Sequence, residues 1–191
     1  MECYFFGTFN PPHIGHIELA KKVLAEFNFK KIVFVPSNIP PHKKGFISFF
    51  HRYNMLKLIE NSFLEVSDIE AHLPEPSYSY RTIESILKKS GVNKLNFIIG
   101  FDAFKLIKTW KNPEYIKEKL RFIVLKRTGD KREDIEKLKL DGYDFVIVDN
   151  INTIDISSSE IREKIKNNQS IKGLTDDKII RYIEENELYR N

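Results

Sequence analysis

Short apolar runs alternate with segments of helical periodicity along most of this 191-residue chain. The runs are rich in Val, Ile and Phe, are bounded by turn residues and span positions 3–6, 31–35, 95–99, 121–125 and 144–148. Continuous apolar runs of this length are typical of strands that are buried on both faces of a parallel sheet. A further strand is expected within residues 65–73, where the apolar pattern is less regular.

The segments between the runs repeat apolar residues every three or four positions, as amphipathic helices do. This pattern predicts helices over residues 16–27, 50–59, 80–88, 113–120 and 131–140. Strands that alternate with helices indicate a doubly wound, Rossmann-like parallel α/β sheet. After residue 149 a polar loop and two helices, over 158–166 and 176–187, are expected instead. We therefore expect one domain over residues 1–191, of which about 157–191 is a small helical extension.

Composition and charge exclude several classes of protein. Hydrophobic residues make up 41% of the chain and charged residues 30%, a balance that excludes collagen-like and wholly disordered chains. The single cysteine, Cys3, excludes an internal disulfide framework and a zinc site built from cysteines. No apolar run approaches the roughly 18–20 residues of a membrane span, and the first residues do not resemble a signal peptide. A cytoplasmic protein without a membrane partner is expected.

The segment GTFNPPHIGH, residues 7–16, follows the first predicted strand and opens the first helix. Ligands of such sheets bind at the carboxyl ends of the strands. Gly7 lets the backbone approach a ligand closely, and the free N–H groups at a helix start attract anions. His13 and His16 are three residues apart and can face the same side of the helix. The segment therefore predicts a cradle for a triphosphate. A purely structural turn is a weaker alternative, and so is a zinc site built on the two histidines, for which the sequence offers no third ligand.

The same segment resembles the (H/T)xGH signature of the nucleotidyltransferase superfamily, especially that of the bacterial nicotinate-nucleotide adenylyltransferases. Phe6 stands where this family commonly has a second glycine, and Asn10 stands where it commonly has aspartate. The tetrapeptide HIGH also occurs in class I aminoacyl-tRNA synthetases, but those are much longer and carry a KMSKS motif that this chain lacks. The resemblance implies the nucleotidyltransferase fold and adenylyl transfer from ATP to nicotinate mononucleotide, which yields deamido-NAD and pyrophosphate.

A second motif near the other end, ISSSEIR at residues 156–162, resembles the family's ISSTxIR motif, with Ser159 in place of threonine. By itself it is a helix N-cap pattern, but serine hydroxyls and N-terminal amides also hold phosphates. The resemblance implies that both motifs meet at one ATP molecule. The ATP-binding residues that it implies are Gly7, Thr8, Phe9, His13, His16, Gly100, Asp102, Arg127, Ser158, Ser159 and Arg162.

Three middle segments resemble those with which the family holds its second substrate: residues 36–43, residues 77–82, and residues 99–102 followed by Trp110. Taken alone, they fit a proline-rich loop, a helix start and a core tryptophan equally well. The resemblance implies that the Trp110 ring stacks on the pyridine of the substrate. The mononucleotide-binding residues that it implies are Asn10, Lys43, Ser79, Thr82, Trp110 and Lys111.

The resemblance assigns catalysis to four residues: His13, His16, Lys43 and Arg162. The acceptor is already an ionised phosphate, so alignment and charge neutralisation suffice and no general base is needed. Magnesium is expected to arrive with ATP, and no metal site made of protein ligands is expected. Three alternatives stay open: nicotinamide mononucleotide as acceptor, phosphopantetheine as acceptor, or a non-catalytic nucleotide- or RNA-binding protein. The last is disfavoured because the lysines behind the net charge of +4 are spread along the chain. Arg52, which matches an arginine frequent in the family, fits either the site or a salt bridge on a helix surface.

Overall fold

The apolar runs form one parallel sheet in the computed structural model, which describes residues 1–126, 141–148 and 156–190. Within these residues the sheet has six strands in the order β3-β2-β1-β4-β5-β6. The strands are β1 Glu2–Gly7, β2 Lys31–Pro36, β3 Leu64–Val66, β4 Leu95–Gly100, β5 Leu120–Leu125 and β6 Phe145–Val148. The chain order reverses between β1 and β4, which pair in parallel. Their carboxyl ends, Gly7 and Gly100, mark the switch point at which such sheets bind ligands.

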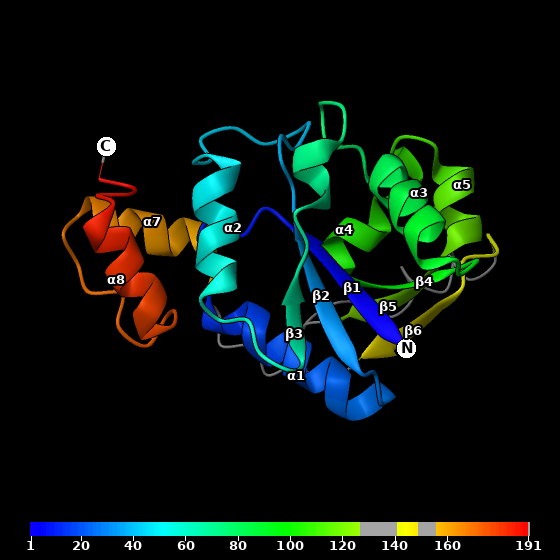
Figure 1. Ribbon diagram of the computed structural model, residues 1–191, viewed down its shortest axis with the longest axis horizontal. Coiled ribbons are helices and arrows are strands. Elements are labelled where there is room, and N and C mark those ends of the chain that lie inside the picture. The colour runs from blue at the N-terminus through cyan, green and yellow to red at the C-terminus, as the bar shows by residue number, and fades with distance from the viewer. Residues whose placement is uncertain (127–140, 149–155, 191) are drawn as a thin grey trace.

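Helices cover both faces of this sheet (Figure 1). The helices and 3-10 turns that pack directly on it are α1 Ile14–Phe27 and α2 Phe49–Lys57 on one face, and η1 Ile69–His72, α3 Ser79–Ser90, α4 Phe101–Lys105, η2 Ile107–Thr109 and α5 Pro113–Lys119 on the other. Side chains alternate between the faces, so Phe5 and Phe34 pack with α1 while Tyr4 and Val33 pack with α3. The predicted doubly wound α/β fold is confirmed.

Two further helices, α7 Ser158–Lys166 and α8 Asp177–Glu185, lie on the side of α2 that faces away from the sheet (Figure 1). Ile161 of α7 and Ile179 of α8 are buried in one apolar cluster with Met55 of α2. The Ser157 side chain caps α7 by accepting the Glu160 N–H at 3.1 Å. The predicted helical extension is present, and its packing brings the start of α7 to the start of α1.

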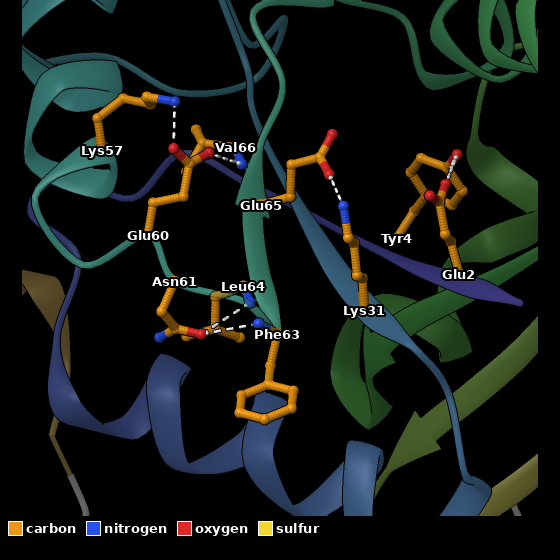
Figure 2. A network of polar contacts seen from close by, with 10 residues as sticks. All are labelled: Glu2, Tyr4, Lys31, Lys57, Glu60, Asn61, Phe63, Leu64, Glu65 and Val66. Atoms are coloured by element: carbon orange, nitrogen blue, oxygen red, sulfur yellow. Dashed lines mark hydrogen bonds and ion pairs between the residues drawn. The ribbon is translucent and has the colours of Figure 1, made fainter.

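β3 forms one edge of the sheet and is protected by polar side chains (Figure 2). Glu60 accepts the Val66 N–H at 2.9 Å, and Asn61 accepts the Leu64 N–H at 3.1 Å. Lys31 of β2 bonds Glu65 of β3 at 2.8 Å. Charged residues and satisfied N–H groups of this kind discourage pairing with another chain.

This edge strand is shorter than the sequence predicts. We expected a strand within residues 65–73, but pairing ends at Val66 and residues 69–72 form the 3-10 turn η1. The Ser67 hydroxyl accepts the Ile69 N–H at 3.3 Å, and such a local bond turns the chain away from the strand direction. The resulting turn carries Glu70 beneath the loop that follows β2.

The other elements match their predicted ranges to within a few residues, except that the short α4 and η2 were not expected. Their five and three residues are too few to display a helical period. The helix predicted over 131–140 lies outside the described residues. None of the helices in the described ranges combines the length and the apolar character of a membrane-spanning helix.

Candidate functional site

Two cavities adjoin at the switch point of the sheet. The histidine pocket, of about 550 Å³, lies between the first turn and the start of α7 and is lined by His13 and His16. The tryptophan pocket, of about 510 Å³, lies between β4, the loop after β2 and the start of α3, and is lined by Trp110. The residues that line both pockets are Phe5, Phe6, Gly7, Thr8, Lys43 and Gly100. Two ligands that fill these pockets therefore meet at Lys43 and the ends of β1 and β4.

The first turn depends on Gly7 and on the ring of Phe9. Phe9 has a backbone φ of 50° and is only 2% exposed, because its ring folds back beneath the turn. The ring lies against Phe34 with centroids 5.3 Å apart and against His16 at 5.0 Å. A Cβ at position 7 would lie 2.8 Å from the tip of this ring, a distance that side chains do not tolerate. Glycine at position 7 therefore lets an aromatic residue support the cradle from below.

The rings of His13 and His16 lie against each other at the start of α1, tilted by 31° with their centroids 3.7 Å apart. The His13 backbone N–H donates to Nδ1 of His16 at 3.2 Å, so Nδ1 is an acceptor and the proton of the neutral ring lies on Nε2. Burial lowers the pKa of His16 well below its ordinary value of 6.5, and the charges of His13 and Lys43 add to this effect. His16 is therefore a neutral N–H donor in the histidine pocket at pH 7.

Cations line the histidine pocket opposite the histidines. Arg162 donates to the Asn10 carbonyl at 2.8 Å and to the Ser159 hydroxyl at 3.1 Å, and Ser158 donates to the Pro11 carbonyl at 2.8 Å. These bonds attach the start of α7 to the first turn. Burial lowers the pKa of Lys43, with the nearby charges of Arg162 and Arg52 contributing. No Asp or Glu is among the described residues that line this pocket, so the pocket suits a polyanion.

Arg52 of α2 lies fully buried behind both pockets. Its guanidinium donates at 2.5–2.9 Å to four backbone carbonyls, those of Thr8, Ser37, Asn38 and Ile47. The rings of Phe46 and Phe49 lie 5.4 and 5.8 Å from it. Burial lowers its pKa from 12.5 to about 10, which leaves it charged at pH 7. The alternative that Arg52 forms a salt bridge on the helix surface is wrong. Its buried guanidinium instead holds three loop segments together.

An aromatic wall and polar groups bound the tryptophan pocket. Trp110 is partly buried, and its ring contacts Phe97 edge-on at 6.3 Å. Ser77 ties the start of α3 to the loop after β2, since its N–H donates to the Ile39 carbonyl at 2.8 Å and its hydroxyl accepts the Ile39 N–H at 3.0 Å. A flat ring with hydroxyl, amide and ammonium donors beside it suits a planar ligand that carries an anionic group.

The chain matches known proteins over nearly its whole length. The model of the cytidylyltransferase-like family matches residues 4–164. A Clostridium tetani protein named as a probable nicotinate-nucleotide adenylyltransferase is 39% identical, over 99% of this chain and 98% of its own. The nicotinate-nucleotide adenylyltransferase of Bacillus subtilis is 33% identical, over 98% of this chain and 97% of its own. The chain belongs to the nicotinate-nucleotide adenylyltransferase family.

The fold of this family member also matches a solved structure. The nicotinic acid mononucleotide adenylyltransferase of Plasmodium falciparum, complexed with NaAD, superposes with a TM-score of 0.82 at 23% identity. The match covers 98% of this chain and 96% of that one. The nucleotidyltransferase fold that the motifs implied is confirmed.

This family member brings most of the residues implied by the motifs together. The histidine pocket gathers Gly7, Thr8, Phe9, Asn10, His13, His16, Lys43, Gly100, Ser158, Ser159 and Arg162. The tryptophan pocket gathers Lys43, Ser79, Trp110 and Lys111. Arg127 lies outside the described residues.

Two implied residues of the family member do not line either pocket. Thr82 is 1% exposed and donates its hydroxyl to Glu70 at 2.8 Å, while the other Glu70 oxygen accepts the Asn38 N–H at 3.0 Å. Thr82 thus supports the loop after β2 from behind. The Asp102 side chain is 76% exposed and pairs with Lys105 at 3.2 Å, because α4 starts immediately after β4 and turns this side chain outward.

The departure from the family's usual aspartate at Asn10 has a structural explanation. Its Nδ2 donates to the Gly45 carbonyl at 3.3 Å, while its Oδ1 accepts from the Ile47 N–H at 3.3 Å and from the Tyr189 hydroxyl at 3.0 Å. A carboxylate could accept the last two bonds but could not donate to Gly45. The carboxamide of Asn10 is therefore engaged with the protein rather than with a ligand.

Glu70 and Tyr189 are the supporting residues that sequence reasoning missed. Nothing around Glu70 in the sequence marks it as buried, because acidic residues are normally exposed. Tyr189 lies 179 residues from its partner Asn10. A polar residue that occupies an apolar position of a helical pattern would have indicated burial. Neither Glu70 nor Tyr189 occupies such a position.

Proposed function

We propose that this chain transfers the adenylyl group of ATP to nicotinate mononucleotide, giving deamido-NAD and pyrophosphate. The observation that carries the proposal is the pair of adjoining pockets, one lined by imidazoles, hydroxyls and cations and the other walled by Trp110, which share Lys43. Direct transfer of an adenylyl group from one substrate to the other needs this adjacency. The activity that the relatives carry in their names supports the same conclusion.

The reaction needs alignment and fixed donors more than it needs a base. An oxygen of the acceptor phosphate attacks the α-phosphorus of ATP. The bond from that phosphorus to the oxygen that bridges the α- and β-phosphates breaks, and pyrophosphate leaves with that oxygen. The acceptor oxygen is already ionised, so no proton has to be removed. His16 donates its Nε2–H to the α-phosphate as charge develops on its oxygens, because the bond from His13 to Nδ1 fixes the ring.

The remaining groups position the two anions. Ser158, Ser159 and Arg162, at the start of α7, hold the β- and γ-phosphates, and the N-terminus of α1 adds its own N–H groups. Lys43 lines both pockets, so its ammonium bridges the acceptor phosphate and the triphosphate. Holding two reactants in line in this way can lower a barrier by roughly 7–11 kcal/mol.

Magnesium enters with ATP as part of the substrate in this proposal. Among the described residues, no group of three or more His, Cys, Asp or Glu side chains comes together. Mg²⁺ commonly keeps several waters and binds mainly to substrate phosphates. The cationic, carboxylate-poor lining of the histidine pocket is compatible with such a complex.

Replacing Trp110 with alanine is expected to raise KM for nicotinate mononucleotide about 5- to 150-fold, since stacking on an aromatic ring is worth ~1–3 kcal/mol. KM for ATP should stay within about twofold, because Trp110 lines the tryptophan pocket only. Steady-state pyrophosphate release with each substrate varied in turn measures both constants. Phe63→Ala is a matched control, because this ring is 60% exposed and lines neither pocket. Equal losses for both substrates would make Trp110 a core residue that merely packs on Phe97.

Pyrophosphate release from ATP and magnesium, with three acceptors in separate reactions, tests the proposed function. Nicotinate mononucleotide should give the highest kcat/KM, ahead of nicotinamide mononucleotide and phosphopantetheine. A preference for either other acceptor would keep adenylyl transfer and overturn the assignment of the tryptophan pocket. Folded protein that binds ATP but releases no pyrophosphate with any acceptor would overturn the enzyme and favour a nucleotide-binding protein.

A further inference from the structure

The segment that follows α8 bends back toward the first turn. Glu187 and Tyr189 have backbone φ values of 50° and 65°, and a positive φ is unfavourable for residues with large side chains. Between them, Leu188 is buried in the apolar cluster of α2, α7 and α8, and its N–H donates to the Ile183 carbonyl at 3.0 Å. The anchored Leu188 and the two strained residues together direct the Tyr189 side chain toward Asn10.

The bond between Tyr189 and Asn10 has a fixed direction. The Ile47 N–H can only donate and the Gly45 carbonyl can only accept, so the orientation of the Asn10 carboxamide is determined by these two neighbours. Tyr189 must then donate its O–H to Oδ1 of Asn10. Burial raises the pKa of the Tyr189 phenol, although Arg162 and Arg52 lie near enough to oppose this rise. The phenol keeps its proton at neutral pH and the donor is always present.

Asn10 passes this contact on to the loop that carries Lys43. It bonds Gly45 and Ile47, which are two and four residues beyond Lys43. Gly45 has a φ of 69°, and, its own atoms and two chain neighbours aside, no atom of the described residues lies within 4 Å of the position that its Cβ would take. The loop is therefore held by hydrogen bonds at this point rather than by packing. Arg162 bonds the Asn10 carbonyl at 2.8 Å, so the same residue also joins the start of α7.

We propose that Tyr189 is a positioning residue for the reaction: through Asn10 it holds residues 43–47, and with them Lys43, at the junction of the two pockets. The inference rests on the proposed function and assigns a role in it to the segment after α8. Tyr189 lines neither pocket, so its effect passes through Lys43 and not through a ligand.

Tyr189→Phe tests this role, because it removes only the hydroxyl. A hydrogen bond of this kind contributes ~1 kcal/mol, which corresponds to an about fivefold loss of kcat. KM for ATP should change less than about twofold, because the histidines and the start of α7 keep their contacts. The matched control is Tyr182→Phe on α8, whose hydroxyl contacts His51 at 3.0 Å and Asn54 at 3.2 Å, away from the first turn. The control should lower stability comparably and keep kcat within about twofold of the wild type.

A double-mutant cycle with Lys43→Met separates positioning from general loosening. If Tyr189 acts through Lys43, Tyr189→Phe should cause less than about a twofold further loss of kcat in the Lys43→Met background. A full fivefold loss in that background, or a wild-type kcat for Tyr189→Phe alone, would overturn the inference.

A second measurement, amide hydrogen exchange, does not depend on activity. The Ile47 amide should exchange about fivefold faster in Tyr189→Phe than in the wild type, and at the wild-type rate in Tyr182→Phe. Unchanged exchange in Tyr189→Phe would overturn the contact as a restraint on the loop. A wild-type chain that is inactive with all three acceptors would instead refute the proposed function, so the two failures are distinguishable.

Discussion

Replacing His16 with alanine should lower kcat for pyrophosphate release about 10²–10³-fold, the usual loss when one preorganised donor to a transition state is removed. The ring is held by the His13 N–H on one side and by Phe9 below it, so it does not have to reorganise as charge develops. Burial keeps the pKa of His16 low and the ring neutral, with its proton directed to Nε2. Single-turnover kinetics with saturating ATP and nicotinate mononucleotide would measure the chemical step directly.

His72→Ala is the matched control for this variant. The His72 side chain is 69% exposed, pairs with Asp68 at 3.3 Å, and lines neither pocket. It should leave kcat within about twofold of the wild type. A loss of less than tenfold in His16→Ala, from protein that keeps its ATP affinity, would refute the role of His16 as the donor to the α-phosphate.

Replacing Arg52 with methionine should reduce the free energy of unfolding by roughly 4 kcal/mol, because each buried acceptor left without a partner costs about 1–3 kcal/mol. Methionine fills a similar length of space but donates no hydrogen bond, so four backbone carbonyls lose the same donor. Those carbonyls belong to the first turn and to the loops on either side of Lys43. KM should therefore rise for both substrates, unlike the selective effect of Trp110→Ala. Urea unfolding and substrate kinetics on the same preparation would measure both.

Arg121→Met provides the matched control on the exposed surface of β5. Arg121 lies 4.0 Å from Asp144 in an exposed pair, and such pairs contribute ~0–1 kcal/mol. If Arg52→Met is too unstable to purify, Arg52→Lys keeps the charge without the planar fork and should show a partial loss. A change of less than about 1 kcal/mol in either Arg52 variant would show that the loops do not depend on this guanidinium.

The sheet and the cradle could be predicted because their signals are local in the sequence. An apolar strand followed by Gly7 and a helix start places His13 and His16 at the carboxyl ends of the strands. This inference needs no knowledge of distant contacts. The motif at 156–162 could be assigned to the same ligand only through the family resemblance, since nothing in the sequence between the two motifs specifies that the two ends meet.

The direction of individual side chains could not be predicted in this way. Thr82 lies one turn into α3, and only the burial of Glu70 on a separate turn makes its hydroxyl face inward. Arg52 reads as an exposed cation because charged residues are normally exposed. Its burial follows from four carbonyls that three separate segments supply, and no periodicity within α2 encodes their arrangement.

The histidine pocket joins segments that are far apart in the sequence, which has a consequence for synthesis on the ribosome. Its bonds link Pro11 to Ser158, Pro12 to Thr175 and Asn10 to Tyr189, over 147, 163 and 179 residues. The nascent chain can assemble the six strands, the last of which ends at Val148, before these partners emerge, since domains fold as their residues become available. A ribosome-bound chain that stops short of α7 would thus present the sheet without a closed histidine pocket. Binding of nucleotide should begin only once the start of α7 has joined the first turn, so that translation itself times the appearance of activity.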